Sequence, residues 1–240
     1  MVEQFKKTVI DGDMIMIHQH MQCTFALRHE EIVISAPPIA ELKDRWPALF
    51  CEAQLCSEFH RITNQNLLYF LFAALDKYTP QLLCKKRKNG SFGKKIQDVL
   101  MAYEEQDKNN IAAARTAALA GLPMYLKEDS SEVFKTCKDE LEANQDGAVA
   151  LVAVVNEEEV PAEVPFETHH VSFVLEDQVV MSHRSWTYSV VILFGLIYAL
   201  HLSYPEKLSG FFEFIQVVLL NLDGRKQLKP KLQALRNELD

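Results

Sequence analysis

The sequence has no apolar run long enough to cross a membrane. Its longest predominantly apolar stretch, residues 188–200, covers 13 positions, whereas a membrane-spanning helix needs roughly 20. His201, Ser203 and Pro205 follow it directly. We therefore predict a fully buried core helix over about residues 185–202 and no membrane partner. The first residues also lack an apolar leader region, so we expect no secretory signal.

Closely spaced cysteine pairs are missing as well. The chain has five cysteines, and an odd number without repeated short spacing is typical of free thiols in a reducing compartment. The sequence therefore indicates a cytoplasmic or nuclear protein. Its two close histidine pairs, at 18–20 and 169–170, lack the repeated Cys or His spacing that zinc sites use. We predict no metal site and no cofactor.

No known catalytic motif is present. The sequence contains no G-x-S-x-G, no H-E-x-x-H, no phosphate-binding P-loop and no dinucleotide-binding G-x-G-x-x-G. Isolated carboxylates such as Asp139, Glu140 and Glu142 do not by themselves define a catalytic geometry. We therefore predict that the protein is not an enzyme and see no evident small-molecule substrate. We rank an enzyme on an unfamiliar helical scaffold third among the hypotheses for the function, after two non-catalytic ones.

The composition is that of an ordinary globular protein. The chain has 240 residues, of which 48% are hydrophobic and 24% charged, enough for one large domain or two small ones. Its formal net charge is -8. This charge argues against binding nucleic acid by overall charge, because domains that do so are usually basic. A local basic site is compatible with this negative net charge.

From Pro38 onward the apolar residues recur at helical spacing, which predicts a series of helices up to about residue 123. Pro47 and Pro80 are expected to break two of these helices and to start new ones. Gly121 and Pro123 are expected to end an Ala-rich helix.

Asp129 and Glu132 have the spacing of a capping box. This spacing predicts a further helix around Phe134 and Cys137.

The pattern changes at Gly147. Residues 148–157 form a β-branched run, and residues 169–177 alternate between apolar and polar side chains. We predict a small β-hairpin at about 148–180, inserted late into a mainly α, multi-helix fold.

The predicted organisation has three parts. Residues 1–37 form an N-terminal extension whose order the pattern does not specify. Residues 38–222 form the helical core domain, which includes the hairpin, and residues 225–240 form a C-terminal amphipathic helix. A division of the core near Gly147 is the alternative.

The C-terminal helix carries leucines at heptad spacing, with lysine and arginine between them. They are Leu228, Leu232, Leu235 and Leu239. This leucine seam either packs on its own domain or offers a surface to a partner helix. Both alternatives stay open at this point.

Three stretches resemble a known family. They are TFALRHEEIV (24–33), ELKDRWPALFCEAQLCSEFHRITNQNL (41–67) and LFGLIYALHLSYPEKLSGFFEFIQVVLLNLDG (193–224). The chain is similar, over about residues 22–240, to fish proteins described as sterile-alpha-motif-domain-containing-protein-3-like. Because the shared region begins close to Met1, we expect no sterile alpha motif, a small helical oligomerisation module, before it, and we do not carry its oligomerisation over. The resemblance supplies no catalytic motif and no functional residue.

The strongest local signal is a basic run within an acidic protein. It consists of Lys85, Lys86, Arg87, Lys88, Lys94 and Lys95. Such a run is a candidate nuclear-import signal or contact for an anionic partner. The alternative is a solvated helix end, where basic side chains complement the helix dipole. Only Phe92 interleaves with the run, so it offers no aromatic platform for stacking bases.

Acidic residues gather in a second segment, 157–177, which has no lysine or arginine. Our leading hypothesis is a non-enzymatic, intracellular protein–protein interaction protein, either scaffold or regulator. Its basic and acidic segments would steer a protein partner or pair with each other in a homo-oligomer. The alternative is a nuclear nucleic-acid-associated protein that uses the basic run at 85–95.

Overall fold

The structure is a computed structural model, and it describes residues 38–45, 47–84, 91–107, 109–131, 133–137, 149–155, 164, 166, 168–223 and 227–239. The described helices are α3 (Ile39–Arg45), α4 (Glu52–Thr63), α5 (Leu67–Cys84), α6 (Ser91–Glu104), α7 (Ile111–Tyr125), α8 (Trp186–Ala199), α9 (Ser209–Phe214) and α10 (Pro230–Leu239). Short helical turns are η1 (Pro47–Phe50), η3 (Glu206–Leu208) and the π-helical η4 (Ile215–Leu219).

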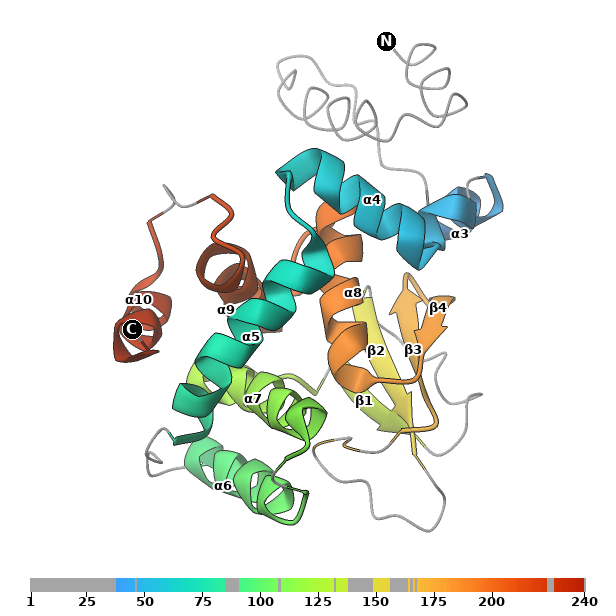
Figure 1. Ribbon diagram of the computed structural model, residues 1–240. Helices are drawn as coiled ribbons and strands as arrows, with labels where there is room; N and C mark the ends of the chain where they lie inside the picture. The colour runs from blue at the N-terminus through green and yellow to red at the C-terminus, as the bar shows by residue number, and fades with distance from the viewer. Residues whose placement is uncertain are drawn as a thin grey trace.

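A four-stranded sheet packs beside these helices (Figure 1). Its strands are β1 (Phe134–Cys137), β2 (Val149–Val154), β3 (His170–Leu175) and β4 (Gln178–His183), in that order across the sheet. β1 runs parallel to β2, and the other neighbours are antiparallel. The predicted fold class, mainly α with β structure inserted late in the chain, is confirmed.

The sheet is larger than the predicted hairpin. β2 and β3 are the two predicted strands, and Val149 pairs opposite Leu175. β4 adds to β3 through a tight turn at Glu176 and Asp177, both of which have positive φ angles.

The helix predicted around Phe134 and Cys137 was wrong, because this segment forms β1. The Asp129 carboxylate accepts the Ser131 N–H in a local turn, and the chain then pairs with β2. There the N–H of Leu151 donates to the Val133 carbonyl at 2.6 Å.

The prolines act differently from one another. Pro47 begins η1 and separates α3 from α4, as predicted. The break predicted at Pro80 was wrong, because α5 continues through it to Cys84. Leu75 and Leu82 are both buried on either side of this proline, so tertiary packing of one apolar face outweighs the lost hydrogen bond. α7 likewise continues through Pro123.

α8 is the predicted buried helix and lies at the centre of the molecule. It packs against α4, α5, α7 and three strands, and the Ser185 hydroxyl caps it by accepting the Tyr188 N–H at 3.4 Å. Gly195 allows α5 to approach closely, because a Cβ there would lie 2.5 Å from Leu67 Cδ2. Among the described residues, no helix combines the length and the apolar character needed to cross a bilayer.

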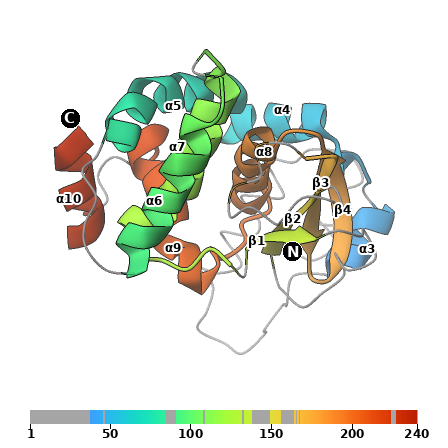
Figure 2. The ribbon, with the colours of Figure 1, turned by 90° about the horizontal axis from the view of Figure 1, so that it is seen from below.

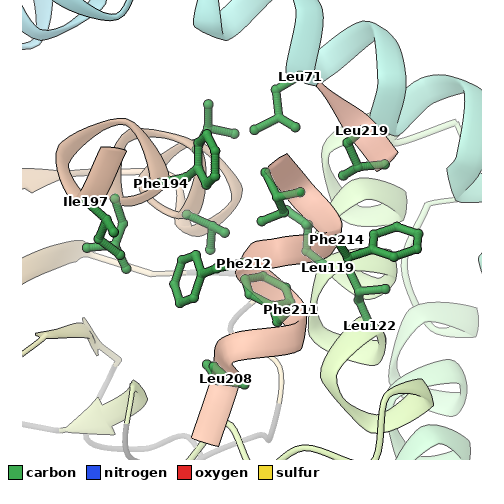
Figure 3. Packing of buried hydrophobic residues seen from close by; sticks show 14 of the residues in the cluster. Leu71, Leu119, Leu122, Phe194, Ile197, Leu208, Phe211, Phe212, Phe214 and Leu219 are labelled. Atoms are coloured by element: carbon green, nitrogen blue, oxygen red, sulfur yellow. The ribbon is translucent and has the colours of Figure 1, made fainter. Parts of the chain in front are cut away.

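One hydrophobic cluster extends from Ile39 to Leu239. At its centre, the aromatic side chains of α9 meet α7 and α8 (Figure 3). Phe211, Phe212 and Phe214 are fully buried there, together with Phe194 of α8. The helices that carry the surfaces described below are therefore fixed to a common core.

Candidate interaction surfaces

Six side chains from three helices form what we call the aromatic–arginine surface. They are Tyr69, Phe72 and Asp76 of α5, Ile111 and Arg115 of α7, and Tyr188 of α8. α5 and α7 lie side by side in both ribbon views (Figures 1 and 2). The surface is therefore built from helices that are separate in sequence and adjacent in space.

Arg115 is held in place by two kinds of contact. Its Nε and one terminal nitrogen donate to the two Asp76 carboxylate oxygens at 2.8 and 2.7 Å. Its guanidinium carbon lies 4.6 Å from the centre of the Phe72 ring, the geometry of a cation–π contact. Because the planar group is already fixed, a partner that contacts it loses little side-chain entropy.

Tyr188 is fixed on the neighbouring part of the surface. Its hydroxyl donates to Glu52 Oε1 at 2.5 Å, and its ring stacks on His183 with centroids 4.3 Å apart. Its ring centroid lies 6.0 Å from that of Phe72. The contacts join α4, α5, α8 and β4 into one rigid aromatic group.

The Tyr188 phenol and the nearby Cys56 thiol both have raised pKa values. Burial, and then the hydrogen bond to Glu52, raise the pKa of the Tyr188 phenol above its ordinary value. Burial, and then the charge of Glu52, also raise the pKa of the Cys56 thiol. Both groups stay protonated at neutral pH, a state in which neither is a good base or nucleophile.

Large apolar side chains on this surface face solvent. The exposed fractions are 63% for Ile111 and 69% for Tyr69. Ile111 lies four residues before Arg115 on α7, and Tyr69 lies three residues before Phe72 on α5, so each pair shares a helix face. Tyrosine and arginine are the residue types enriched among side chains that dominate protein–protein binding.

The basic run is only partly within the described residues. Lys85, Lys86, Arg87 and Lys88 lie outside them, whereas Lys94 and Lys95 are exposed in the first two turns of α6. Lys94 and Lys95 lie near the N-terminal end of α6. They therefore do not complement the negative, C-terminal end of a helix dipole, as the alternative interpretation requires.

Further lysines lie near Glu128 and Asp129, just after α7, and the sequence pattern did not predict this grouping. We call the group the lysine cluster. It comprises Lys94, Lys95, Lys127, Lys207, Lys229 and Lys231, all of them exposed. The signal that could have indicated part of it is the second basic stretch before α10, residues 225–231.

Two carboxylates, Glu128 and Asp129, feel the charges of four of these lysines. The Ser131 N–H, and then its hydroxyl, lower the pKa of Asp129, and the charges of Lys95 and Lys207 lower it further. Burial raises the pKa of Glu128. The N–H groups of Gly210 and Phe211, and then the charges of Lys229 and Lys231, act in the opposite direction and lower this pKa.

The leucine seam packs inside the chain. Leu228, Leu232, Leu235 and Leu239 are 9%, 3%, 3% and 4% exposed and belong to the main hydrophobic cluster. This arrangement corresponds to the alternative in which the leucine seam packs on its own domain. In the part of the chain that the structure describes, no three His, Cys, Asp or Glu side chains are close enough to hold a metal ion.

Comparison with known proteins gives one match. Residues 1–51 match the family model described as Sterile alpha motif domain-containing protein 3, helical domain. The matched range covers about a fifth of the chain and includes α3 and η1. No curated protein matches, and no solved structure does. The resemblance to proteins of this type is confirmed over the matched range.

Proposed function

We propose that this chain, which carries the sterile alpha motif domain-containing protein 3 helical-domain match in residues 1–51, is a non-enzymatic protein–protein interaction protein of the cytoplasm or nucleus. It binds a protein partner through the aromatic–arginine surface. The family match supports an interaction protein in general, and the surface supplies the place of contact. The odd number of cysteines, without repeated short spacing, supports a reducing compartment.

The observation that carries the proposal is the exposure of Ile111 and Tyr69 beside the fixed Arg115 guanidinium. Apolar surface gains about 25 cal/mol for each Å² that a partner removes from water. Arg115 donates to Asp76 through Nε and Nη2, so Nη1 can donate to a carbonyl or carboxylate of the partner. The partner should therefore offer an apolar patch next to a hydrogen-bond acceptor.

A substitution on this surface tests the proposal. Ile111→Asp places a charge at the centre of the contact, and we expect recovery of the partner to fall by about tenfold or more. The measurement is affinity capture from native cells with quantitative mass spectrometry. Met101→Asp is the matched control, because Met101 is also an exposed apolar residue (53%) but lies on α6.

The two variants must both keep the wild-type circular dichroism spectrum. A protein retained by the wild type and by Met101→Asp, and lost with Ile111→Asp, supports the proposal. Identical protein sets for the two variants would contradict it, because the aromatic–arginine surface would then have no part in binding.

A further inference from the structure

The exposed faces of α5 and α7 carry little charge. α5 has 18 residues and α7 has 15, and together they contain three charged side chains, those of Asp76, Lys77 and Arg115. In the whole chain, 24% of the residues are charged. Most exposed positions of the two helices are instead apolar or aromatic, and they include Tyr69, Phe70, Ala73, Ile111 and Ala112. Depletion of charged residues is typical of the centre of a protein–protein interface.

The Asp76–Arg115 pair can make further hydrogen bonds to another molecule. Arg115 donates to Asp76 through Nε and Nη2, so Nη1 still offers two N–H donors to a partner. Each Asp76 oxygen accepts one of these bonds and has a second lone pair. The side chains of Arg115 and Asp76 are 22% and 50% exposed, so a partner can reach both. A donor and an acceptor of opposite charge therefore lie next to each other on the surface.

The aromatic–arginine surface has the features that its partner should have. Those features are an apolar patch and a neighbouring hydrogen-bond acceptor. Ile111 and Tyr69 supply the apolar patch, at 63% and 69% exposure, and the Asp76 carboxylate supplies the acceptor. Such a surface is self-complementary, because both copies use the same patch in a two-fold symmetric contact.

We propose that the aromatic–arginine surface binds the same surface of a second copy of this chain, in a two-fold symmetric dimer. Arg115 of each copy donates to Asp76 of the other, and Ile111 of each copy packs against Tyr69 of the other. Charge complementarity favours this occupant, because each copy brings one guanidinium and one carboxylate to the contact. This dimer rests on the proposed function, since it names the partner of the same surface.

The arrangement of the two helices fits this pairing. α5 and α7 run in the same direction, because Asp76 contacts Arg115 and, farther along both helices, the Leu82 carbonyl accepts the Tyr125 hydroxyl at 2.7 Å. Ile111 and Tyr69 both lie before the ion pair, toward the beginnings of their helices. A two-fold axis running between α5 and α7 (Figures 1 and 2) exchanges the positions of the two helices. It therefore brings Asp76 opposite Arg115 and Ile111 opposite Tyr69.

Sedimentation velocity over a series of protein concentrations tests for this dimer. The wild type should pass from monomer to dimer as its concentration rises. Ile111→Asp enters the contact twice, once from each copy, so a weakening of about tenfold per copy raises the dissociation constant by about 100-fold. Met101→Asp makes the same kind of change at an exposed position of α6 and should dimerise like the wild type.

Charge reversal tests whether the contact is two-fold symmetric. Asp76→Arg leaves arginine at both positions of the pair, and Arg115→Asp leaves aspartate at both. Each variant alone brings like charges together across the contact and should dimerise about 100-fold more weakly than the wild type. Mixed in equal amounts, the two variants bring arginine against aspartate in both halves of the contact. They should then form a heterodimer about as stable as the wild-type dimer, which a fluorescent label on one variant detects.

The outcomes separate this dimer from the proposed function. A wild type that is monomeric at every concentration would overturn the dimer, whereas loss of a different protein in the capture experiment with Ile111→Asp would still support the proposed function. A dimer that persists in Ile111→Asp would place the interface elsewhere and also overturn the inference. So would a mixture of the two charge-reversed variants that stays monomeric while each keeps the wild-type circular dichroism spectrum.

Discussion

Replacing Phe211 by alanine is expected to lower the free energy of unfolding by about 3–5 kcal/mol. Phe211 is fully buried, and its ring lies edge-on to those of Phe134 and Phe212 at centroid distances of 5.5 and 5.1 Å. Phe134 in turn contacts Trp186 at 5.2 Å. The substitution would leave a cavity where β1, α8 and α9 meet, in the region shown in Figure 3.

Urea unfolding followed by far-ultraviolet circular dichroism measures this loss. Phe70→Ala is the matched control, because Phe70 is 44% exposed on α5 and its removal should cost about 1 kcal/mol or less. Equal losses for the two variants would contradict the position assigned to α9 at the centre of the core.

Replacing Glu128 by alanine is expected to lower the free energy of unfolding by about 2–4 kcal/mol. Its carboxylate accepts two backbone N–H groups at the beginning of α9, from Gly210 and Phe211. Both residues are buried, so neither N–H is readily satisfied by water once the carboxylate is gone. Glycine at 210 is part of this contact, because a Cβ there would lie 2.6 Å from Glu128 Oε1.

Glu128→Gln separates hydrogen bonding from packing. Glutamine keeps the shape of the side chain and one acceptor oxygen. We therefore expect about half of the loss in unfolding free energy that alanine causes. Thermal or urea unfolding of the two variants, compared under the same conditions, gives the ratio. A negligible effect of the alanine variant would show that the beginning of α9 is not held by this side chain.

The elements that sequence analysis predicted correctly are those with strong, local patterns. α8 has no polar face, β2 is rich in valine, and β3 places Val171, Phe173 and Leu175 in alternation; both strands are almost wholly buried. β1 is only four residues long and contains two polar positions, so its strand character depends on pairing with β2 farther along the chain. The positive φ angles at Glu176 and Asp177 occur without glycine, so the turn before β4 lacked its usual signal.

The interaction surfaces depend on tertiary contacts that no local pattern specifies. The aromatic–arginine surface takes Phe72, Arg115 and Tyr188 from three different helices. In the sequence, none of these residues differs from an ordinary helical residue. The same is true of Lys95, Lys207 and Lys231, which only the folded chain brings near Glu128 and Asp129. The leucine seam shows the converse, because its heptad spacing fits both an internal and an external partner, and only the structure shows these leucines buried.

Site-specific photo-crosslinking in living cells tests the central claim most directly. A benzophenone amino acid would replace Tyr69 on the aromatic–arginine surface and, in a second variant, Met101 on α6. We predict a discrete crosslinked protein from position 69 and none from position 101. The absence of any crosslink at position 69, or the same products from both positions, would contradict a partner bound at this surface.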